Sequence, residues 1–399
     1  MSEQRRNVVS RLLGGLLVFW HKLVGRRGPV GRRVRKDRPY VVTIIPAHNE
    51  ETSIGATLES LFSQTRQPDL VVVAADNCSD RTVEVASSYQ RRGVVVFETV
   101  DNKYRKVGAL TQAWQRYAKD ADFVLGIDAD TILAPSSLQE LEDEMVENVA
   151  IGGLMARYTF DQGLATGWFS RLLVRLQRLE FTGWTMDILR RQRRTYVLGG
   201  QATLFRGEAL RQVTEHNKRN GPWSVNSQVE DMELTWRLGE LGWETLCSAT
   251  ARAYVGPMLT FRAFWAQRRK WDGGITQTLL ANGINKQTAY PWRLQAKTLL
   301  DASIRFMFFG LLILALLRGS WVWFWVWAIP PVLAMLLNLR TVLRTPHRST
   351  ADIVVAVTLV GSELYLMVRI ATWVVSWVHA ILGIRKDGWA AQYRAEGKA

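Results

Sequence analysis

Two aspartates, Asp128 and Asp130, are separated by a single alanine directly after an apolar run at 123–127. Carboxylates at this spacing in a turn can point into one cleft and bind a hard divalent cation, Mg²⁺ or Mn²⁺, through oxygen, with water and phosphate oxygens as the other ligands. The same spacing is also common in solvated turns. The apolar run before it reads as a strand and favours the metal-binding interpretation.

Asp76 and Lys106 are two further groups that would suit a nucleotide ligand. Asp76 ends an apolar run at 70–75, where its carboxylate could accept hydrogen bonds from a ring N–H or a ribose hydroxyl. Alternatively, this stretch is a helix-capping network, for which Asp80 is the better-placed residue. Lys106 begins a helical segment and could neutralise a phosphate as a compact charge, or it could simply be exposed.

Glu230 and Asp231 begin a segment in which Leu234, Leu238 and Leu241 fall on one helical face. Carboxylates in the first turn of a helix are stabilised by the helix dipole and need no further role. The functional alternative is a general base that takes a proton from an attacking hydroxyl.

The segment from Phe261 to Trp271 mixes aromatic and cationic side chains. One interpretation is a helix that lies at a membrane surface. The other is a binding site in which polar and cationic side chains hold a diphosphate and a tryptophan offers its ring face to a sugar. The residues concerned are Gln267, Arg268, Arg269, Lys270 and Trp271.

A regular alternation of predicted strands and helices would position these residues. Strands are predicted at 41–45, 70–75, 94–99 and 123–128, and helices at 53–64, 82–91 and 106–118. Continuous β-branched runs separated by helices are typical of parallel βαβ units with helices on both sheet faces. Ligands of such sheets bind beyond the carboxyl ends of the strands, where Glu50, Asp76 and Asp128 fall. The sequence therefore predicts an α/β fold with an acidic site at one sheet edge.

The composition favours lipid over nucleic acid as a partner. Lys and Arg number 51 against 36 Asp and Glu, and the net charge of +15 suits nucleic acid, anionic lipid or a nucleotide diphosphate. Eight of the 17 tryptophans lie from Trp292 onward, and tryptophan is enriched where membranes meet water. We therefore expect anionic membrane lipid, and no nucleic acid, as a partner.

The chain divides into four predicted parts. They are a basic segment at 1–38, the α/β domain at 39–275, a membrane domain at 276–384 and a tail at 385–399. The basic segment, with Leu12 to Val24 as its apolar stretch, reads either as an amphipathic helix at the lipid surface or as a solvated tail.

The membrane domain contains hydrophobic segments at 298–317, 321–339 and 352–372. Their lengths suit bilayer-spanning helices, and a buried soluble helical bundle is the alternative. The arginines at 340–348 indicate that this loop is cytoplasmic. If the basic α/β domain is also cytoplasmic, the first two segments form an out-and-back hairpin. We therefore expect a multi-pass protein of the cell membrane with a cytoplasmic α/β domain.

The polar motifs together resemble those of family-2 glycosyltransferases, in the same order. They are Pro46-Ala47-His48-Asn49-Glu50, Asp76-Asn77 with Ser79-Asp80, Lys106 with Gly108-Ala109-Leu110, Asp128-Ala129-Asp130, Val229-Glu230-Asp231 and Gln267-Arg268-Arg269-Lys270-Trp271. The chain resembles membrane-integrated polysaccharide synthases, which make cellulose, chitin, hyaluronan or poly-N-acetylglucosamine. The resemblance covers residues 40–275, and hydrophobic helices follow as in those enzymes.

The resemblance implies a GT-A-type, Rossmann-like domain with a mostly parallel sheet, Mg²⁺ or Mn²⁺, a UDP-sugar donor and a glycan, lipid-linked or protein acceptor. It implies that Asp130 binds the metal and that Asp231 is the catalytic base for direct displacement with inversion. The donor would be bound by Glu50, Asp76, Lys106, Asp128, Gln267, Arg268, Arg269 and Lys270. The acceptor would be bound by Gly199, Gly200, Gln201, Glu230 and Trp271.

Two positions depart from the family pattern. Lys270 stands where the family's Gln-X-X-Arg-Trp motif has arginine, and a lysine lacks the bidentate guanidinium fork. Arg268 or Arg269 would then take over the phosphate contact, or processivity would fall. His48 stands where tyrosine is common.

Two alternatives remain open at this point. One is an enzyme that adds a single sugar to a lipid or protein instead of building a polymer. The other is a non-enzymatic membrane protein that binds anionic lipid or nucleic acid, which leaves the carboxylates at the strand ends without a purpose.

Overall fold

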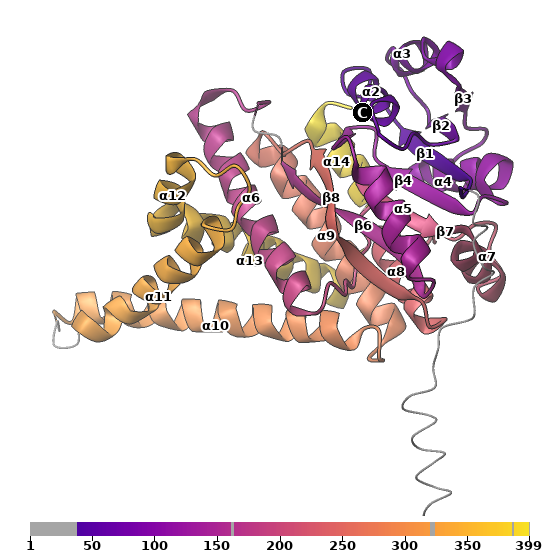
Figure 1. The fold of residues 1–399 in the computed structure, drawn as a ribbon. Coiled ribbons are helices and arrows are strands. Elements are labelled where there is room, and N and C mark those ends of the chain that lie inside the picture. The colour runs from indigo at the N-terminus through magenta and orange to yellow at the C-terminus, as the bar shows by residue number, and fades with distance from the viewer. Residues whose placement is uncertain (1–37, 161–162, 320–323, 385–386, 399) are drawn as a thin grey trace, which may run out of the picture.

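The computed structural model describes residues 38–160, 163–319, 324–384 and 387–398. The amphipathic helix predicted within 1–38 lies outside the described residues. Figure 1 shows a sheet domain on one side and, extending from it, a group of long helices formed by the later part of the chain.

The first half of the sheet is parallel and follows the predicted strands closely. It contains β1 (Val41–Ala47), β2 (Leu70–Ala75), β3 (Val94–Glu98) and β4 (Phe123–Ile127), in the spatial order β3-β2-β1-β4. Val41 and Ile45 of β1 pack into one core while Val42 and Ile44 pack into the other. Alternate side chains of a strand point to opposite faces, so this strand is apolar throughout because both of its faces are buried.

The second half of the sheet is mixed. β7 (Ala202–Arg206) runs antiparallel to β4 and to β6 (Ile151–Phe160), β6 is parallel to β8 (Glu244–Val255), and the short β5 (Thr131–Leu133) closes the sheet antiparallel to β8. The complete order is β3-β2-β1-β4-β7-β6-β8-β5. The predicted α/β class is confirmed, with an antiparallel insertion that the βαβ pattern did not include.

Helices cover both faces of this sheet. They are α2 (Ile54–Phe62), α3 (Thr82–Ser87), α4 (Arg105–Ala113), α5 (Ser137–Glu147), α7 (Gly207–His216) and α8 (Glu230–Glu240). Leu58 and Leu141 lie in one core, and Leu110, Trp114 and Leu234 in the other. These two cores hold the strand ends rigidly and so fix the positions of the polar residues that follow them.

Helices, five of them long and two short, make up most of the rest of the structure (Figure 1). They are α6 (Gly167–Arg190), α9 (Phe261–Asn282), α10 (Ala289–Leu317), α11 (Phe324–Val342), α12 (Thr350–Val357), α13 (Leu359–Ile381) and α14 (Gly388–Glu396). Among the described residues, α10 and α13 are long and apolar enough to cross a membrane. Large apolar side chains of α10 such as Phe306 and Ile313 are exposed, which is the pattern of a surface that contacts lipid.

Three further features of the helical part bear on the predicted segments. Pro330 and Pro331 lie inside the continuous helix α11. The third hydrophobic segment, predicted at 352–372, forms two helices that meet at Thr358. The predicted tail contains α14, which packs against α9 and returns the chain to the sheet domain (Figure 1).

Candidate active site

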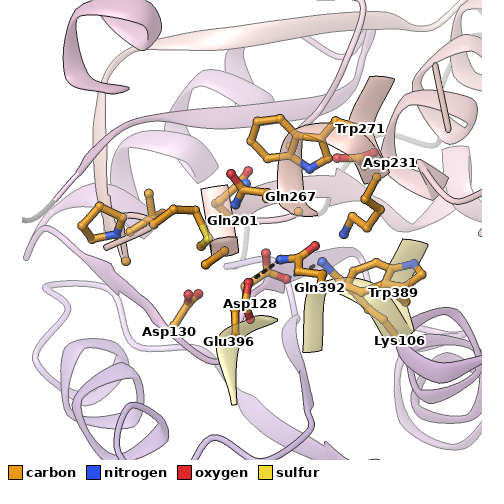
Figure 2. A pocket seen from close by; sticks show the side chains of 18 of the residues that line it. Lys106, Asp128, Asp130, Gln201, Asp231, Gln267, Trp271, Trp389, Gln392 and Glu396 are labelled. Carbon is orange, nitrogen blue, oxygen red and sulfur yellow. Dashed lines mark hydrogen bonds and ion pairs between the residues drawn. The ribbon is translucent and has the colours of Figure 1, made fainter. Parts of the chain in front are cut away.

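A cavity of about 700 Å³ opens at the carboxyl ends of β1, β2 and β4, beneath α8, α9 and α14. Figure 2 shows side chains from the end of β4 and from α8, α9 and α14 converging on it. Thirteen of the predicted site residues line this one cavity: Glu50, Asp76, Lys106, Asp128, Asp130, Gly199, Gly200, Gln201, Glu230, Asp231, Gln267, Lys270 and Trp271. The structure therefore brings together residues more than 200 positions apart.

Lys106 is a largely buried cation in the wall of the cavity. Its Nζ is paired with Oδ1 of Asp128 (dashed in Figure 2) and lies 3.7 Å from Oε1 of the buried Glu230. Burial alone would lower the pKa of Lys106, but the carboxylates of Asp128 and Glu230 outweigh burial and raise it. Lys106 thus remains protonated, and its charge partly balances a cluster of carboxylates.

Close packing explains why position 108, two residues after Lys106, is a glycine. A Cβ there would lie 1.7 Å from Oδ1 of Asn102, so only glycine lets Asn102 approach the helix. From this position Asn102 donates a hydrogen bond of 2.6 Å to Oδ1 of Asp76. The same oxygen accepts a hydrogen bond of 2.7 Å from the hydroxyl of Thr99. The carboxylate of Asp76 is therefore held in a fixed orientation at the edge of the cavity.

Asp76 and Asp80 have different surroundings, and the N-cap residue of α3 is Arg81, which follows Asp80. Oδ1 of Asp80 accepts a hydrogen bond of 2.9 Å from the backbone N–H of Thr82, the first residue of α3. Its other oxygen accepts one from the N–H of Glu51. Asp80 is a structural residue that joins two loops, while Asp76 lines the cavity.

Asp130 is a partly buried carboxylate that faces the cavity (Figure 2). Burial, together with the neighbouring Asp128 and Glu50 carboxylates, raises its pKa to about 7. Within the part of the chain that the structure describes, no hydrogen bond or ion pair satisfies it, and no cluster of three or more metal-ligating side chains occurs. A hard cation held by Asp128 and Asp130, with its other ligands from a diphosphate and water, fits this arrangement.

Asp231 stands in the first turn of α8 and faces the cavity from the opposite wall (Figure 2). Burial and the adjacent Glu230 raise its pKa to about 6, although Lys106 acts in the other direction. One of its oxygens accepts a hydrogen bond of 2.8 Å from the N–H of Met232. A carboxylate with a pKa near neutrality, open to a cavity, has the properties of a general base.

The helix α9 presents one face to the cavity and another to the membrane domain. Gln267, Lys270 and Trp271 line the cavity, as residues three and four apart on a helix should. Arg268 is fully buried and donates to Glu180 at 2.8 Å, and Arg269 donates to the carbonyl of Thr372 on α13 at 3.1 Å. The expectation that Arg268 or Arg269 contacts the diphosphate is therefore corrected, because the helical turn directs both away from it.

The loop before β7 approaches the centre of the site. A Cβ at Gly200 would lie 2.7 Å from Nζ of Lys106 and 3.5 Å from the carboxylate of Asp128. Glycine at this position thus permits the backbone to come close to the Lys106–Asp128 pair. Gly199 and Gln201 line the same cavity.

Sequence reasoning missed several residues of the cavity wall. Tyr158, Glu180 and Trp184 come from β6 and α6, and Arg369 comes from α13. Further ones are Trp389, Gln392, Tyr393, Glu396 and Lys398, from α14 and the residues after it. A charged residue inside a hydrophobic segment is a functional signal, so Arg369 could have been found, whereas the segment after 385 carries no such signal.

Replacing Lys106 with methionine is expected to lower the free energy of unfolding by about 3 kcal/mol, since it leaves buried carboxylates without their cation. Lys119→Met is the matched control, because Lys119 is exposed. The thermal unfolding midpoint of the two purified variants checks this. Equal midpoints for both variants would show that Lys106 does not hold the carboxylate cluster together.

The chain is also similar to proteins of known name. The chain is 23% identical over 243 residues to poly-beta-1,6-N-acetyl-D-glucosamine synthase from Staphylococcus aureus (strain COL), covering 60% of this chain and 55% of that protein. The Staphylococcus epidermidis protein of the same name is 22% identical over 240 residues. The chain thus spans about half the length of these relatives.

A solved structure has the same overall fold. It is a mannosyltransferase from Pyrobaculum calidifontis in complex with GDP-Man and Mn²⁺, with a TM-score of 0.52 and 13% identity, covering 95% of this chain and 97% of that one. The family model described as "Glycosyl transferase family 2" matches residues 42–214, which contain β1 to β4 and the Asp128–Asp130 turn. The fold, the motifs and the relatives agree with this match, and residues 42–214 of the chain are similar to glycosyl transferase family 2.

Proposed function

We propose that this protein is a membrane-bound inverting glycosyltransferase that moves a sugar from a UDP-sugar to a hydroxyl group of a glycan, lipid-linked or other acceptor. One observation carries the proposal. Asp231, a carboxylate with a pKa of about 6, faces the same cavity as Asp128, Asp130 and Lys106. This arrangement supports a base at Asp231 opposite a proposed site for a metal-bound diphosphate.

The donor would lie along the strand ends. Glu50, Asp76, Lys106 and Asp128 are the proposed contacts of the nucleotide, and Gln267 and Lys270 those of the diphosphate. Asp76 is already oriented by Asn102 and Thr99, which lowers the entropic cost of binding. The staphylococcal relatives are named for N-acetylglucosamine, and we infer that UDP-N-acetylglucosamine is the first donor to test.

Asp130, with Asp128, would hold Mg²⁺ or Mn²⁺, which when bound neutralises charge that develops on the leaving diphosphate. Lys106 and, below a pH of about 8, Lys270 add positive charge to the same region. The partly buried Asp130 otherwise has no partner among the described residues, so a cation would offset the repulsion between it and Asp128.

Asp231 would accept the proton of the acceptor hydroxyl. The hydroxyl oxygen then forms a bond to the anomeric carbon from the side opposite the diphosphate, the bond from that carbon to the diphosphate oxygen breaks, and UDP departs with the electron pair. Because attack and departure occur on opposite faces, the configuration at the anomeric carbon inverts. The protonated Asp231 returns its proton to solvent before the next cycle.

Trp271, Glu230 and the loop Gly199–Gln201 would bind the acceptor. Trp271 lies beside Gln267 and close to Asp231 (Figure 2), where its ring face could pack against a sugar.

The same chemistry allows either the addition of a single sugar or the synthesis of a polymer. Mass spectrometry of the product separates them, because a polymerase gives a ladder of masses and a single-addition enzyme gives one.

The helices α10 and α13 would place the enzyme in the cell membrane. Arg340 and Arg344 follow the apolar part of α11, and arginine excess is typical of the cytoplasmic side. A cytoplasmic cavity would have access to nucleotide-sugars, and the basic parts of the chain would contact anionic lipid.

The rate is expected to have a bell-shaped dependence on pH. Asp231 acts as a base only when ionised, so kcat/KM should rise with pH through about 6. Burial lowers the pKa of Lys270 to about 8, so this lysine loses its charge above that pH and the rate should fall. Lys270→Arg should keep the acidic limb and remove the alkaline one, since arginine stays charged. An unchanged alkaline limb in that variant would contradict the role given to Lys270.

The proposal is tested by incubating the purified protein in detergent with a panel of nucleotide-sugars and measuring nucleotide release. UDP release from a UDP-sugar, stimulated by a hydroxyl acceptor and by Mg²⁺ or Mn²⁺, is the expected result. Release from GDP-mannose alone, or no release from any donor, would overturn the assignment of donor or activity.

A further inference from the structure

The residues around α14 occupy the part of the cavity next to β1. Nζ of Lys398 lies 2.5 Å from Oε1 of Glu50, and the carbonyl oxygen of Lys398 accepts a hydrogen bond of 3.0 Å from Nδ2 of Asn49. The same carbonyl lies 3.1 Å from Nε2 of His48. Three consecutive polar residues of the loop after β1 therefore have partners from this one segment.

Tyr393 of α14 covers one face of His48 in the wall of the cavity. Its ring is stacked on that of His48, with centroids 4.6 Å apart and 28° between the planes. Aromatic rings at this separation attract each other by offset stacking, and a nucleobase would use the same face of His48.

The next turns of α14 face the proposed diphosphate site. Figure 2 shows Gln392 and Glu396 directed toward Asp128 and Asp130, with Gln392 donating to Glu396 at 2.7 Å. Glu396 is one of the charges that act on Asp130. A carboxylate is thus presented where the anionic diphosphate would meet the metal.

Two contacts fix the start of α14 at the opposite wall. Asp387 accepts a hydrogen bond of 2.6 Å from Arg105, next to Lys106, and Nζ of Lys270 lies 3.1 Å from the ring centroid of Trp389. The start of α14 therefore contacts Lys270 directly and contacts Arg105, the residue before Lys106.

We propose that α14 is an internal competitor of the nucleotide-sugar, which binds only when this helix leaves its place. This inference rests on the proposed function, because it takes the residues at β1 and β4 as the donor site. Tyr393 occupies the stacking surface, Lys398 the carboxylate of Glu50, and Glu396 the approach to Asp130, so the helix and the donor cannot be bound together. In this state the enzyme is inhibited by its own chain.

With an internal competitor, the apparent Kd for UDP is the Kd of the open site divided by the fraction of molecules in which the site is open. If the helix is docked nine-tenths of the time, the apparent Kd for UDP is about tenfold higher than that of the open site. A membrane, an acceptor or a partner that binds α14 would then activate the enzyme without touching the catalytic residues.

The test uses the full chain in detergent and measures UDP binding by calorimetry at fixed Mn²⁺. Three variants release the helix in different ways: deletion of residues 387–399, Lys398→Ala and Gly388→Val. Gly388 allows close packing, because a Cβ there would lie 2.8 Å from Cγ of Lys270 and 2.5 Å from Oε1 of Gln228. Arg394→Ala is the matched control, since it also removes a cation from α14 but at an exposed position.

The deletion and Gly388→Val should tighten UDP binding roughly tenfold, Lys398→Ala should tighten it less, and Arg394→Ala should leave it unchanged. A peptide of residues 387–399 added to the deletion variant should weaken UDP binding competitively. Weaker UDP binding in both the deletion and Gly388→Val, with unchanged melting curves, would show that α14 belongs to the donor site and overturn the proposal. Unchanged binding in both would do the same.

These outcomes are distinct from failure of the proposed function. If no variant binds UDP at all, including the deletion variant, the donor assignment itself is wrong. If wild-type protein binds UDP and transfers sugar but the deletion has no effect on affinity, only the competitor is wrong.

Discussion

Replacing Asp231 with asparagine is expected to lower kcat for sugar transfer by about 10² to 10⁴-fold, the range over which a positioned general base contributes. Asparagine has nearly the same shape but cannot accept the proton of the acceptor hydroxyl. UDP affinity should change little, because the base lies on the wall opposite Asp128 and Asp130 (Figure 2). Transfer kinetics and calorimetric titration with UDP measure the two effects separately.

Asp120→Asn is the matched control for this substitution, since Asp120 is exposed. It should leave both kcat and the affinity for UDP unchanged. Transfer at the wild-type rate by the Asp231→Asn protein would rule out Asp231 as the base. Loss of UDP binding together with transfer would instead place Asp231 in the donor site.

Removal of divalent metal with EDTA is expected to reduce transfer by about 100-fold or more, because the charge of the leaving diphosphate then lacks its counter-ion. Excess Mg²⁺ or Mn²⁺ should restore the rate. Asp130→Asn should have a similar effect on transfer and should also weaken Mn²⁺ binding, measured directly by electron paramagnetic resonance.

Asp143→Asn, at an exposed position of α5, is the control for the metal experiment. It should bind Mn²⁺ like the wild-type protein. Full activity in EDTA, or undiminished Mn²⁺ binding by Asp130→Asn, would contradict the role given to Asp130.

The parallel half of the sheet could be predicted because its signals are local. The strands β1, β2 and β4 are apolar runs, and the residue after each of them is polar and lines the cavity. The antiparallel pairing of β7 with β4 could not be predicted in this way. It depends on contacts between Phe205 and Val124, 81 positions apart, and nothing in the local pattern of either strand sets the direction of pairing.

The site was predictable where it followed motifs and not where it depended on the orientation of a helix. Gln267, Lys270 and Trp271 share one helical face, so Arg268 and Arg269 must point elsewhere, but the sequence does not say which face meets the cavity. The structure answers this by pairing Arg268 with Glu180 of α6.

The contribution of α14 is the clearest case of a feature that sequence reasoning could not reach. Lys398 and Glu50 are 348 positions apart and form an ion pair. The segment carries no motif, no long apolar run and no helical periodicity beyond a short turn. Its place in the cavity follows from the path of α13, which returns the chain to the sheet domain (Figure 1).

The central claim is direct displacement by an acceptor oxygen activated by Asp231 at a metal-bound UDP-sugar. The measurement that tests it most directly is the anomeric configuration of the product formed from an α-linked UDP-sugar, determined by proton NMR. The account predicts a β-linked product, formed in equal amount with UDP and absent when Asp231 is asparagine. An α-linked product, or UDP release without any glycoside, would contradict it.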